Sequence, residues 1–232
     1  MKKYVQGILL DVGCGSSNYR QYCLEATQIR QYWGVDYPAW QNNLMKGDAL
    51  TSASGFVKVL YRHRPARPDV WGDGCELGIR DGSIDTVLSF GVLEHIEKYE
   101  AYIRECIRVL RDGGCMIMTI PFLYQAHGGD DARDDFVRWT RWGIEKALVS
   151  KGLSIVEIRP FGGVGTMLSQ LMNSYLIKRL NLYNGRLLVF KMALGAGLSL
   201  LFLAGNVICL GLDALDSDHH YACGFHVVAR KA

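Results

Sequence analysis

Short apolar runs alternate with amphipathic segments along most of the chain. Helical spacing is clearest over residues 97–110, where Tyr102, Ile103 and Cys106 fall on one apolar face. The runs that we predict to be strands are residues 5–12, 32–36, 69–72, 84–90, 115–120, 153–159 and 224–230. The segments that we predict to be helices are residues 19–30, 97–110 and 141–151, with a further candidate near 54–61. Since strands that alternate with helices are typical of a parallel sheet covered on both faces, we predict an α/β chain with a doubly wound, mostly parallel seven-stranded sheet.

The composition excludes several classes of protein. The 26 basic and 23 acidic residues are nearly balanced, so no basic face is indicated and we expect no nucleic-acid partner. The seven cysteines are scattered and never form a CxxC pair, which favours reduced thiols in a cytoplasmic protein over a disulfide framework or a zinc site. The chain leads directly from its first residues into an apolar run, so we expect no cleavable signal peptide.

The first predicted strand runs directly into a glycine turn. Asp11 closes the strand and Gly13 and Gly15 follow, and glycine lets a backbone approach a ligand closely. The second predicted strand ends at Asp36, as a carboxylate that binds a ribose diol would require. These features together indicate a nucleoside cofactor. A dinucleotide-binding turn has a third glycine, whereas residues 16–18 are Ser, Ser and Asn, which counts against a nicotinamide cofactor.

A wider set of motifs points to one family. The motifs that carry the resemblance are residues 10–15, 34–36, 72–77, 81–87, 92–96 and 108–114. In their order and spacing, over roughly residues 5–160, they resemble the class I S-adenosylmethionine-dependent methyltransferases, in particular the type 11 methyltransferase group. The resemblance implies a Rossmann-like fold, S-adenosyl-L-methionine as the cofactor and methyl transfer as the activity.

The resemblance also implies roles for particular residues. Those that would bind the cofactor are Asp11, Gly13, Cys14, Gly15, Asp36, Tyr37, Asp73, Gly74, Phe90, Gly91 and His95. Asp11 and backbone N–H groups of the turn would hold the methionine part, Asp36 the ribose hydroxyls and Asp73 the adenine amino group. Asp48 lies in a similar motif and competes with Asp73 for the last role. His95 also fits a purely structural, hydrogen-bonding role.

The segment after the fifth predicted strand is expected to overhang the transferred methyl group, because it leaves the carboxyl end of a strand. His127 is the candidate general base there, since an imidazole with an ordinary pKa of about 6.5 accepts a proton near neutral pH. Otherwise, His127 tethers the loop by pairing with a nearby aspartate. The aspartates of residues 128–135 match no calcium loop, and we predict no metal site. Residues 37–68 are a candidate cover for the same site.

A long insertion, residues 161–221, separates the sixth and seventh predicted strands and contains an apolar stretch at 187–212. That stretch is long enough to span a bilayer, but a single crossing would keep the last strand from returning to the sheet. Three interpretations remain open. The insertion packs on the domain or on a second subunit, dips into a membrane interface, or lines a pocket for an apolar acceptor. We therefore divide the chain into a methyltransferase domain, residues 1–160 and 222–232, and a helical hairpin, residues 161–221.

Together these patterns predict an enzyme that transfers a methyl group from S-adenosyl-L-methionine to a small or lipid-linked acceptor. Oxygen is the expected acceptor atom because His127 offers a base, and nitrogen and carbon remain open. Two alternatives belong to other classes: a catalytically inactive, methyltransferase-like assembly subunit, and an NAD-dependent oxidoreductase. The expected location is cytoplasmic, with peripheral membrane contact or a homodimer formed through residues 161–221.

Overall fold

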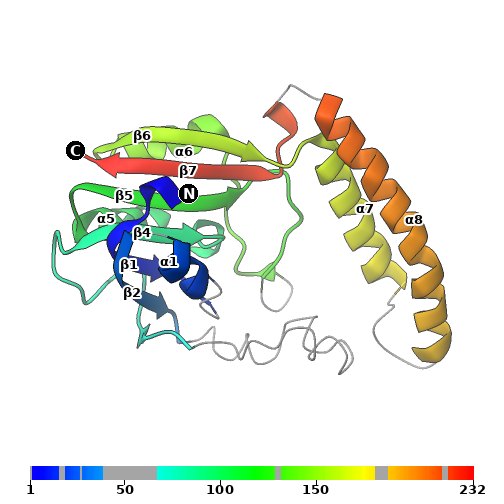
Figure 1. Ribbon diagram of the computed structural model, residues 1–232, viewed down its shortest axis with the longest axis horizontal. Coiled ribbons are helices and arrows are strands. Elements are labelled where there is room, and N and C mark those ends of the chain that lie inside the picture. Colours follow the sequence, from blue (N-terminus) through cyan, green and yellow to red (C-terminus); the bar gives the residue numbers. More distant parts are fainter. Residues whose placement is uncertain are drawn as a thin grey trace.

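A computed structural model gives the fold, and the structure describes residues 2–15, 19–26, 28–38, 67–128, 132–180, 188–215 and 219–232. The predicted features that lie outside these residues are Asp48, the candidate helix near 54–61 and most of the predicted cover at 37–68. One seven-stranded sheet, with the order β3-β2-β1-β4-β5-β7-β6, forms the centre of the molecule (Figure 1). The strands are β1 (Gln6–Val12), β2 (Gln28–Asp36), β3 (Val70–Trp71), β4 (Ile84–Phe90), β5 (Leu110–Pro121), β6 (Leu153–Phe161) and β7 (Gly224–Lys231). The helices and 3₁₀ turns of the described residues are η1 (Lys2–Tyr4), α1 (Arg20–Ala26), η2 (Leu93–His95), α5 (Tyr99–Val109), α6 (Arg141–Val149), α7 (Val164–Leu180), α8 (Leu188–Leu215) and η4 (His219–Tyr221).

The sheet is mixed. β1 to β5 pair in parallel, whereas β7 runs antiparallel to both β5 and β6. α1 contributes to the core on one face of the sheet, and α5 and α6 contribute on the other. The predicted class, a doubly wound α/β chain with a mostly parallel seven-stranded sheet, is therefore confirmed. The strand order changes direction between β1 and β4, and this switch point is where ligands of such sheets bind.

The helix predicted over residues 19–30 is wrong in its second half. α1 ends at Ala26, and β2 already begins at Gln28. Gln28 pairs with Gln6 of β1, and Ile29 packs into the core cluster on the α1 face of the sheet. Pairing in the sheet thus overrides the helix propensity of a polar segment rich in Gln and Arg.

The core occupies both faces of the sheet, because the side chains of a strand point alternately to its two faces. Leu10 of β1 belongs to the larger cluster, which α5 and α6 complete with Ile103 and Leu148. Leu9 belongs to the smaller cluster, to which α1 contributes Cys23. These side chains are buried, and complete burial of one aliphatic side chain contributes about 1.5–3 kcal/mol. The two clusters therefore hold the strand ends from which the functional side chains extend.

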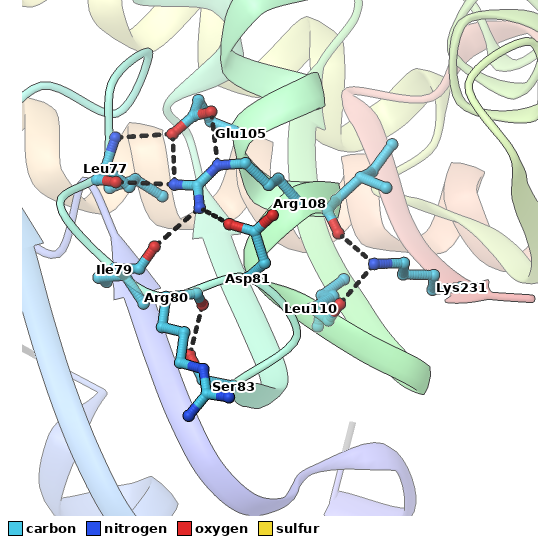
Figure 2. Close-up of polar contacts among 10 residues, drawn as sticks. Leu77, Ile79, Arg80, Asp81, Ser83, Glu105, Arg108, Leu110 and Lys231 are labelled. Carbon is cyan, nitrogen blue, oxygen red and sulfur yellow. Dashed lines mark hydrogen bonds and ion pairs between the residues drawn. The ribbon is translucent and has the colours of Figure 1, made fainter.

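Arg108 of α5 fastens the loop before β4 to that helix (Figure 2). Its guanidinium donates to both carboxylate oxygens of Glu105, at 2.9 and 2.8 Å. It also donates to the backbone carbonyls of Leu77 and Ile79, at 2.7 and 2.8 Å, and pairs with Asp81. A planar guanidinium reaches this set of acceptors, which a lysine ammonium could not satisfy. The loop between β3 and β4 is thereby fixed beside α5.

α7 and α8 form a helical hairpin between β6 and β7 and project beyond the edge of the sheet (Figure 1). Asp213 of α8 accepts hydrogen bonds from the backbone N–H groups of Gly165 and Thr166, at 2.7 and 3.0 Å, and so satisfies donors in the first turn of α7. Asn173 donates to Asn206 at 2.8 Å across the pair. The hairpin thus packs on itself, which differs from one predicted arrangement, an extra layer on the domain.

The hairpin carries many exposed apolar side chains. They are Leu168, Leu171, Met172 and Tyr175 of α7 and Leu203, Val207, Ile208, Leu210, Leu212 and Leu215 of α8. Among the residues that the structure describes, no helix combines the length and the hydropathy needed to cross a bilayer. The division into residues 1–160 with 222–232 and residues 161–221 stays a prediction.

Candidate functional site

A cavity of about 280 Å³ lies at the carboxyl ends of β1, β2 and β4. The residues that line it are Val12, Gly13, Gly15, Val35, Asp36, Tyr37, Gly72, Gly74, Gly91, Val92, His95, Ile96, Tyr102 and His127. The predicted site residues among them are Gly13, Gly15, Asp36, Tyr37, Gly74, Gly91, His95 and His127. The volume is near the lower end of the range for small-molecule sites, roughly 300–1,000 Å³. The structure therefore brings most of the predicted site residues to one place, at the switch point of the sheet.

The glycine turn after β1 is shaped by close contacts that a side chain would disrupt. Gly13 has a φ of +75°, and a Cβ there would lie 2.4 Å from Cγ2 of Val92. The N–H groups of Gly13 and Cys14 both donate to the carbonyl of Val35, at 2.8 and 3.1 Å. Gly15 donates its N–H to Oδ2 of Asp36 at 2.5 Å. These three N–H groups are used inside the protein, which differs from their predicted part in holding the methionine moiety.

Asp36 stands at the end of β2 with both carboxylate oxygens oriented by the backbone. Oδ2 accepts from Gly15, and Oδ1 accepts the N–H of Tyr37 at 2.7 Å. The residue is 8% exposed, and burial raises its pKa while the two N–H donors oppose that rise. Each carboxylate oxygen has a second lone pair, so the two oxygens can also accept hydrogen bonds from two adjacent hydroxyls. The geometry fits a ribose diol.

Asp11 is placed differently from its predicted role in the cofactor site. It does not line the cavity, and its carboxylate accepts a hydrogen bond from the hydroxyl of Tyr32 on the α1 side of the sheet. Burial raises the pKa of Asp11 to about 6, although the hydrogen bond from Tyr32 lowers it. In the structure, Asp11 therefore serves as the hydrogen-bond acceptor of the Tyr32 hydroxyl. Its contact with a cofactor stays a prediction.

Three further predicted residues lie outside the cavity lining. Asp73 is exposed, and its Oδ1 accepts the N–H of Cys75 at 2.8 Å, as in an Asx turn. Phe90 packs edge-to-face on Tyr19, with ring centroids 4.8 Å apart. Cys14 is buried. Their predicted roles in binding the cofactor stay predictions.

Tyr102 lines the cavity, although sequence reasoning assigned it to the apolar face of a helix. It is fully buried, and its hydroxyl shares a hydrogen bond of 2.8 Å with that of Ser89. A Cβ on Gly74 would lie 2.6 Å from its ring, so Gly74 makes room for the tyrosine. The phenolic hydroxyl on an otherwise apolar face was the only sequence signal for this position.

Two histidines form another part of the wall, with the buried Glu94 beside both. Nδ1 of His95 lies 2.7 Å from the carbonyl oxygen of Asp134, so this nitrogen is the donor. The backbone N–H of His127 donates to Oδ2 of Asp135 at 2.9 Å, and its Nδ1 lies 3.3 Å from the same oxygen. The two imidazole rings meet edge-to-face, with centroids 4.9 Å apart. The His95 ring is therefore oriented through Nδ1, whereas His127 is held through its backbone N–H. Nε2 of each ring lies near Glu94, at 3.8 to 4.0 Å from Oε1.

The electrostatics of this wall lower the pKa of His127 and so favour its neutral form. Burial and the neighbouring His95 lower the pKa of His127, and Asp135 only partly opposes them. Burial raises the pKa of Asp135, but hydrogen bonds from Arg138 to both of its oxygens hold that pKa below the ordinary value. Burial raises the pKa of Glu94. Sequence reasoning gave no role to Glu94, Asp135 or Arg138; the adjacent Glu94-His95 pair and the i,i+3 spacing of Asp135 and Arg138 were the available signals.

The comparisons with known proteins agree with this geometry. Residues 10–118 match the model of a family described as "Methyltransferase domain". Residues 10–118 thus carry the sequence pattern of a methyltransferase domain. The fold of the chain matches that of a solved S-adenosylmethionine-dependent methyltransferase from Archaeoglobus fulgidus with a TM-score of 0.57, at 15% identity, covering 99% of this chain and 89% of that one.

Two curated relatives each match about half of this chain. A Mycobacterium tuberculosis protein named "Probable S-adenosylmethionine-dependent methyltransferase" is 41% identical over 113 residues, which are 49% of this chain and 35% of that protein. The ajmaline N-methyltransferase of Rauvolfia serpentina is 32% identical over 111 residues, which are 47% of this chain and 34% of that protein. The chain thus spans about a third of the length of the curated relatives that it matches.

The cavity fits the cofactor that this family implies. Asp36 offers a diol-binding carboxylate, and a Cβ placed on Gly15 would meet no described atom within 4 Å, so the backbone of the turn is open to a ligand there. Ile96 and the ring of Tyr102 add apolar surface of the kind on which an adenine packs. His127 comes from the loop after β5, on the side of β1 and β4 away from β2 and Asp36. A bound nucleoside would therefore lie across the switch point, between Asp36 and the histidine wall.

Proposed function

We propose that this protein binds S-adenosyl-L-methionine in the cavity and transfers its methyl group to a hydroxyl oxygen of a small or lipid-linked acceptor. One observation carries the proposal: a single cavity is lined at β2 by a diol-binding carboxylate and, after β5, by a neutral histidine. The carboxylate of Asp36 would bind the ribose of a nucleoside, and the imidazole of His127 would take the proton of an acceptor. The convergence of residues predicted from separate motifs supports the same conclusion.

The protein's part in the reaction is to orient, to exclude water and to move a proton. The cofactor supplies a methyl group on a sulfonium, which is already a strong electrophile. Asp36 fixes the ribose, and the alignment of acceptor oxygen with methyl carbon supplies much of the acceleration. We assign the proton of the acceptor hydroxyl to His127, whose imidazole lines the cavity and whose lowered pKa favours the neutral form that can accept a proton.

Oxygen is favoured over nitrogen as the acceptor atom because of that histidine. A hydroxyl loses its proton as the methyl group arrives, whereas a neutral amine attacks with its own lone pair and needs no base in the same step. One relative is named an N-methyltransferase, so an amine acceptor is the second candidate. Turnover of His127→Ala on the identified acceptor separates the two: an oxygen acceptor predicts a large loss of turnover with unchanged cofactor affinity.

The proposal is tested first by calorimetric titration with S-adenosylmethionine, S-adenosylhomocysteine and NAD. We expect binding of the two sulfur compounds and none of NAD. Asp36→Ala should weaken binding of S-adenosylhomocysteine by about 1–3 kcal/mol, as expected for loss of a buried hydrogen-bonding partner. Asp112→Ala is the matched control, because that side chain is 90% exposed and outside the cavity lining. If neither sulfur compound binds, the assembly-subunit alternative is favoured. If NAD binds, an oxidoreductase is favoured.

We further propose that the protein works at the cytoplasmic side of a membrane, which the α7–α8 hairpin contacts peripherally. The exposed apolar side chains of both helices support this location. Residues 178–191 comprise the end of α7, the segment that follows it and the start of α8. They contain four basic residues and no acidic one, a composition that suits anionic lipid headgroups. A hairpin at the lipid surface would bring a lipid-linked acceptor close to the domain.

Flotation with vesicles that contain anionic lipid tests this second proposal. Val207→Glu and Ile208→Glu place a charge at positions that are 60% and 67% exposed, and each should reduce the vesicle-bound fraction. Trp142→Glu is the control, because it changes a 70% exposed apolar residue on α6, outside the hairpin. A concentration-dependent dimer that Val207→Glu dissociates, with no vesicle binding by the parent protein, would replace the lipid surface with a second copy.

A further inference from the structure

One carboxylate and two imidazoles meet beside the cavity with their ligand atoms close together. Nε2 of His127 lies 3.8 Å from Oε1 of Glu94, and Nε2 of His95 lies 4.0 Å from the same oxygen. One ligand atom from each of the three residues can be chosen so that all lie within 4.8 Å of one another. His95 and His127 also line the cavity, so a group held by them would face its interior.

The imidazole of His95 is held in the way that metal-binding histidines usually are. A ligating histidine generally donates its other ring N–H to a carbonyl or carboxylate, which fixes the ring and the tautomer. Nδ1 of His95 donates to the backbone carbonyl of Asp134 at 2.7 Å. Nδ1 of His127 lies 3.3 Å from Asp135, whose carboxylate is itself held by Arg138. The Nε2 atoms of both histidines lie on the side of Glu94.

Glu94 has a polar atom that the surrounding protein does not satisfy. Its side chain is 2% exposed, and Oε2 finds no hydrogen-bond partner within the part of the chain that the structure describes. A buried carboxylate without a partner is costly, and such groups in proteins are usually paired or coordinate a metal. This unsatisfied oxygen is independent of the histidine geometry and points to a cationic ligand at the same place.

We propose that Glu94, His95 and His127 bind a divalent transition-metal ion next to the acceptor end of the cavity. Two imidazoles and one carboxylate suit zinc and similar ions better than magnesium or calcium, which prefer oxygen. Tetrahedral coordination with bonds of about 2.0 Å separates ligand atoms by roughly 3.3 Å, so the histidines would approach Glu94 by about half an ångström. Three protein ligands leave the remaining position open to the cavity, as in catalytic rather than structural sites.

The bound ion would change the role of His127 in the proposed reaction, on which this inference rests. The acceptor hydroxyl binds at the open position, where the ion lowers its pKa and its proton is released to water. The resulting oxygen attacks the methyl carbon: the O–C bond forms, the S–C bond breaks, and its electron pair stays on the sulfur of S-adenosylhomocysteine. His127 is then a metal ligand and not a general base. The prediction of no metal site was made from the aspartate run, whereas this proposal concerns the Glu94-His95 pair together with His127.

The test begins with metal binding alone, so that it does not depend on turnover. The full chain is stripped with a chelator and titrated with Zn²⁺, with Mg²⁺ as the comparison, and Co²⁺ spectra distinguish imidazole and carboxylate ligands from the thiolates of the cysteines. We expect one Zn²⁺ site without thiolate ligation. Glu94→Gln and His127→Ala should each weaken it by about 100-fold, at least as much as loss of an outer partner of a metal ligand. His226→Ala, an exposed histidine of β7, should leave it unchanged.

The outcomes separate this inference from the proposed function. S-adenosylhomocysteine binding by a protein that takes up no Zn²⁺, or whose Zn²⁺ binding survives both Glu94→Gln and His127→Ala, would overturn the metal site and leave the methyltransferase proposal intact. Zn²⁺ binding that is lost in both variants, in a protein that binds neither sulfur compound, would support the site and contradict the function. If a variant fails to fold, Glu94→Asp provides the second measurement, because it shortens the ligand while keeping its charge.

Discussion

Replacement of Gly13 by alanine tests whether the glycine turn is shaped by its contact with Val92. Alanine would have to adopt the left-handed conformation at a φ of +75°, which costs about 1–2 kcal/mol. Its Cβ would also lie 2.4 Å from one methyl group of Val92 and 2.8 Å from the other. Overpacking of this kind costs about 1–3 kcal/mol. We therefore expect Gly13→Ala to lower the free energy of unfolding by about 2–5 kcal/mol.

Gly15 provides the matched control within the same turn. Its φ is +53°, but a Cβ there has no atom within 4 Å among the described residues. Gly15→Ala should therefore cost only the conformational part, about 1–2 kcal/mol. Urea unfolding followed by circular dichroism measures both values, provided that the slope with denaturant is the same for each variant.

The double variant Gly13→Ala, Val92→Ala isolates the steric part. Removing the two methyl groups of Val92 should recover about 1–3 kcal/mol relative to the sum of the single changes, which a double-mutant cycle reports as a coupling energy. The reasoning is refuted if Gly13→Ala is no more destabilising than Gly15→Ala, or if the coupling energy with Val92 is zero. Either result would mean that the turn relaxes away from η2.

Further predictions concern the loop before β4, one helix cap and one buried acid. Arg108→Lys should destabilise the protein by about 1–3 kcal/mol in urea unfolding, because one ammonium cannot satisfy the acceptors that the guanidinium reaches, and a smaller loss would show that water replaces it. Thr140→Ala should cost about 1 kcal/mol and Thr140→Ser much less, since the hydroxyl accepts the N–H of Gly143 at 3.0 Å at the start of α6; equal losses would exclude the cap. Burial raises the pKa of Asp11 to about 6, so the folded state retains a proton that the unfolded chain, with a pKa of about 3.9, has lost. The contribution of Asp11 to the free energy of unfolding should therefore fall as pH rises from about 4 to 6, and Asp11→Asn should remove that slope. Identical pH profiles for the parent and this variant would show that the carboxyl titrates normally.

The fold was largely predictable because most of its strands are apolar runs bounded by polar turns, a pattern that is visible in the local sequence. The strand at 84–90 was predicted with the bounds of β4, as an apolar run between polar turns. The failure at Gln28 arose where pairing with β1, a property of the whole sheet, decides the structure of a polar segment. Helix and strand propensities depend on nearby residues in the sequence, so they do not report pairing with a distant strand.

The candidate site was predictable where a backbone requirement selects the residue. Gly13 and Asp36 follow from the glycine turn and from the strand end, and both line the cavity. Glu94 and Tyr102 were not predictable in this way, because their roles depend on which side chains approach from distant elements. A buried carboxylate and a tyrosine on an apolar face become informative only when their neighbours are known.

β7 has a consequence for the order in which the chain can fold. It lies between β5 and β6 and pairs with both, yet the whole α7–α8 hairpin precedes it in the chain. During synthesis, β5 and β6 therefore emerge well before the strand that joins them, and each has an unpaired edge of the kind that templates aggregation. Closing a longer loop adds little entropy cost, so the hairpin can vary in length without preventing the final pairing. The last step of folding is thus the insertion of β7 between β5 and β6. Until that step, the unpaired edges of both strands have to be protected from aggregation during translation.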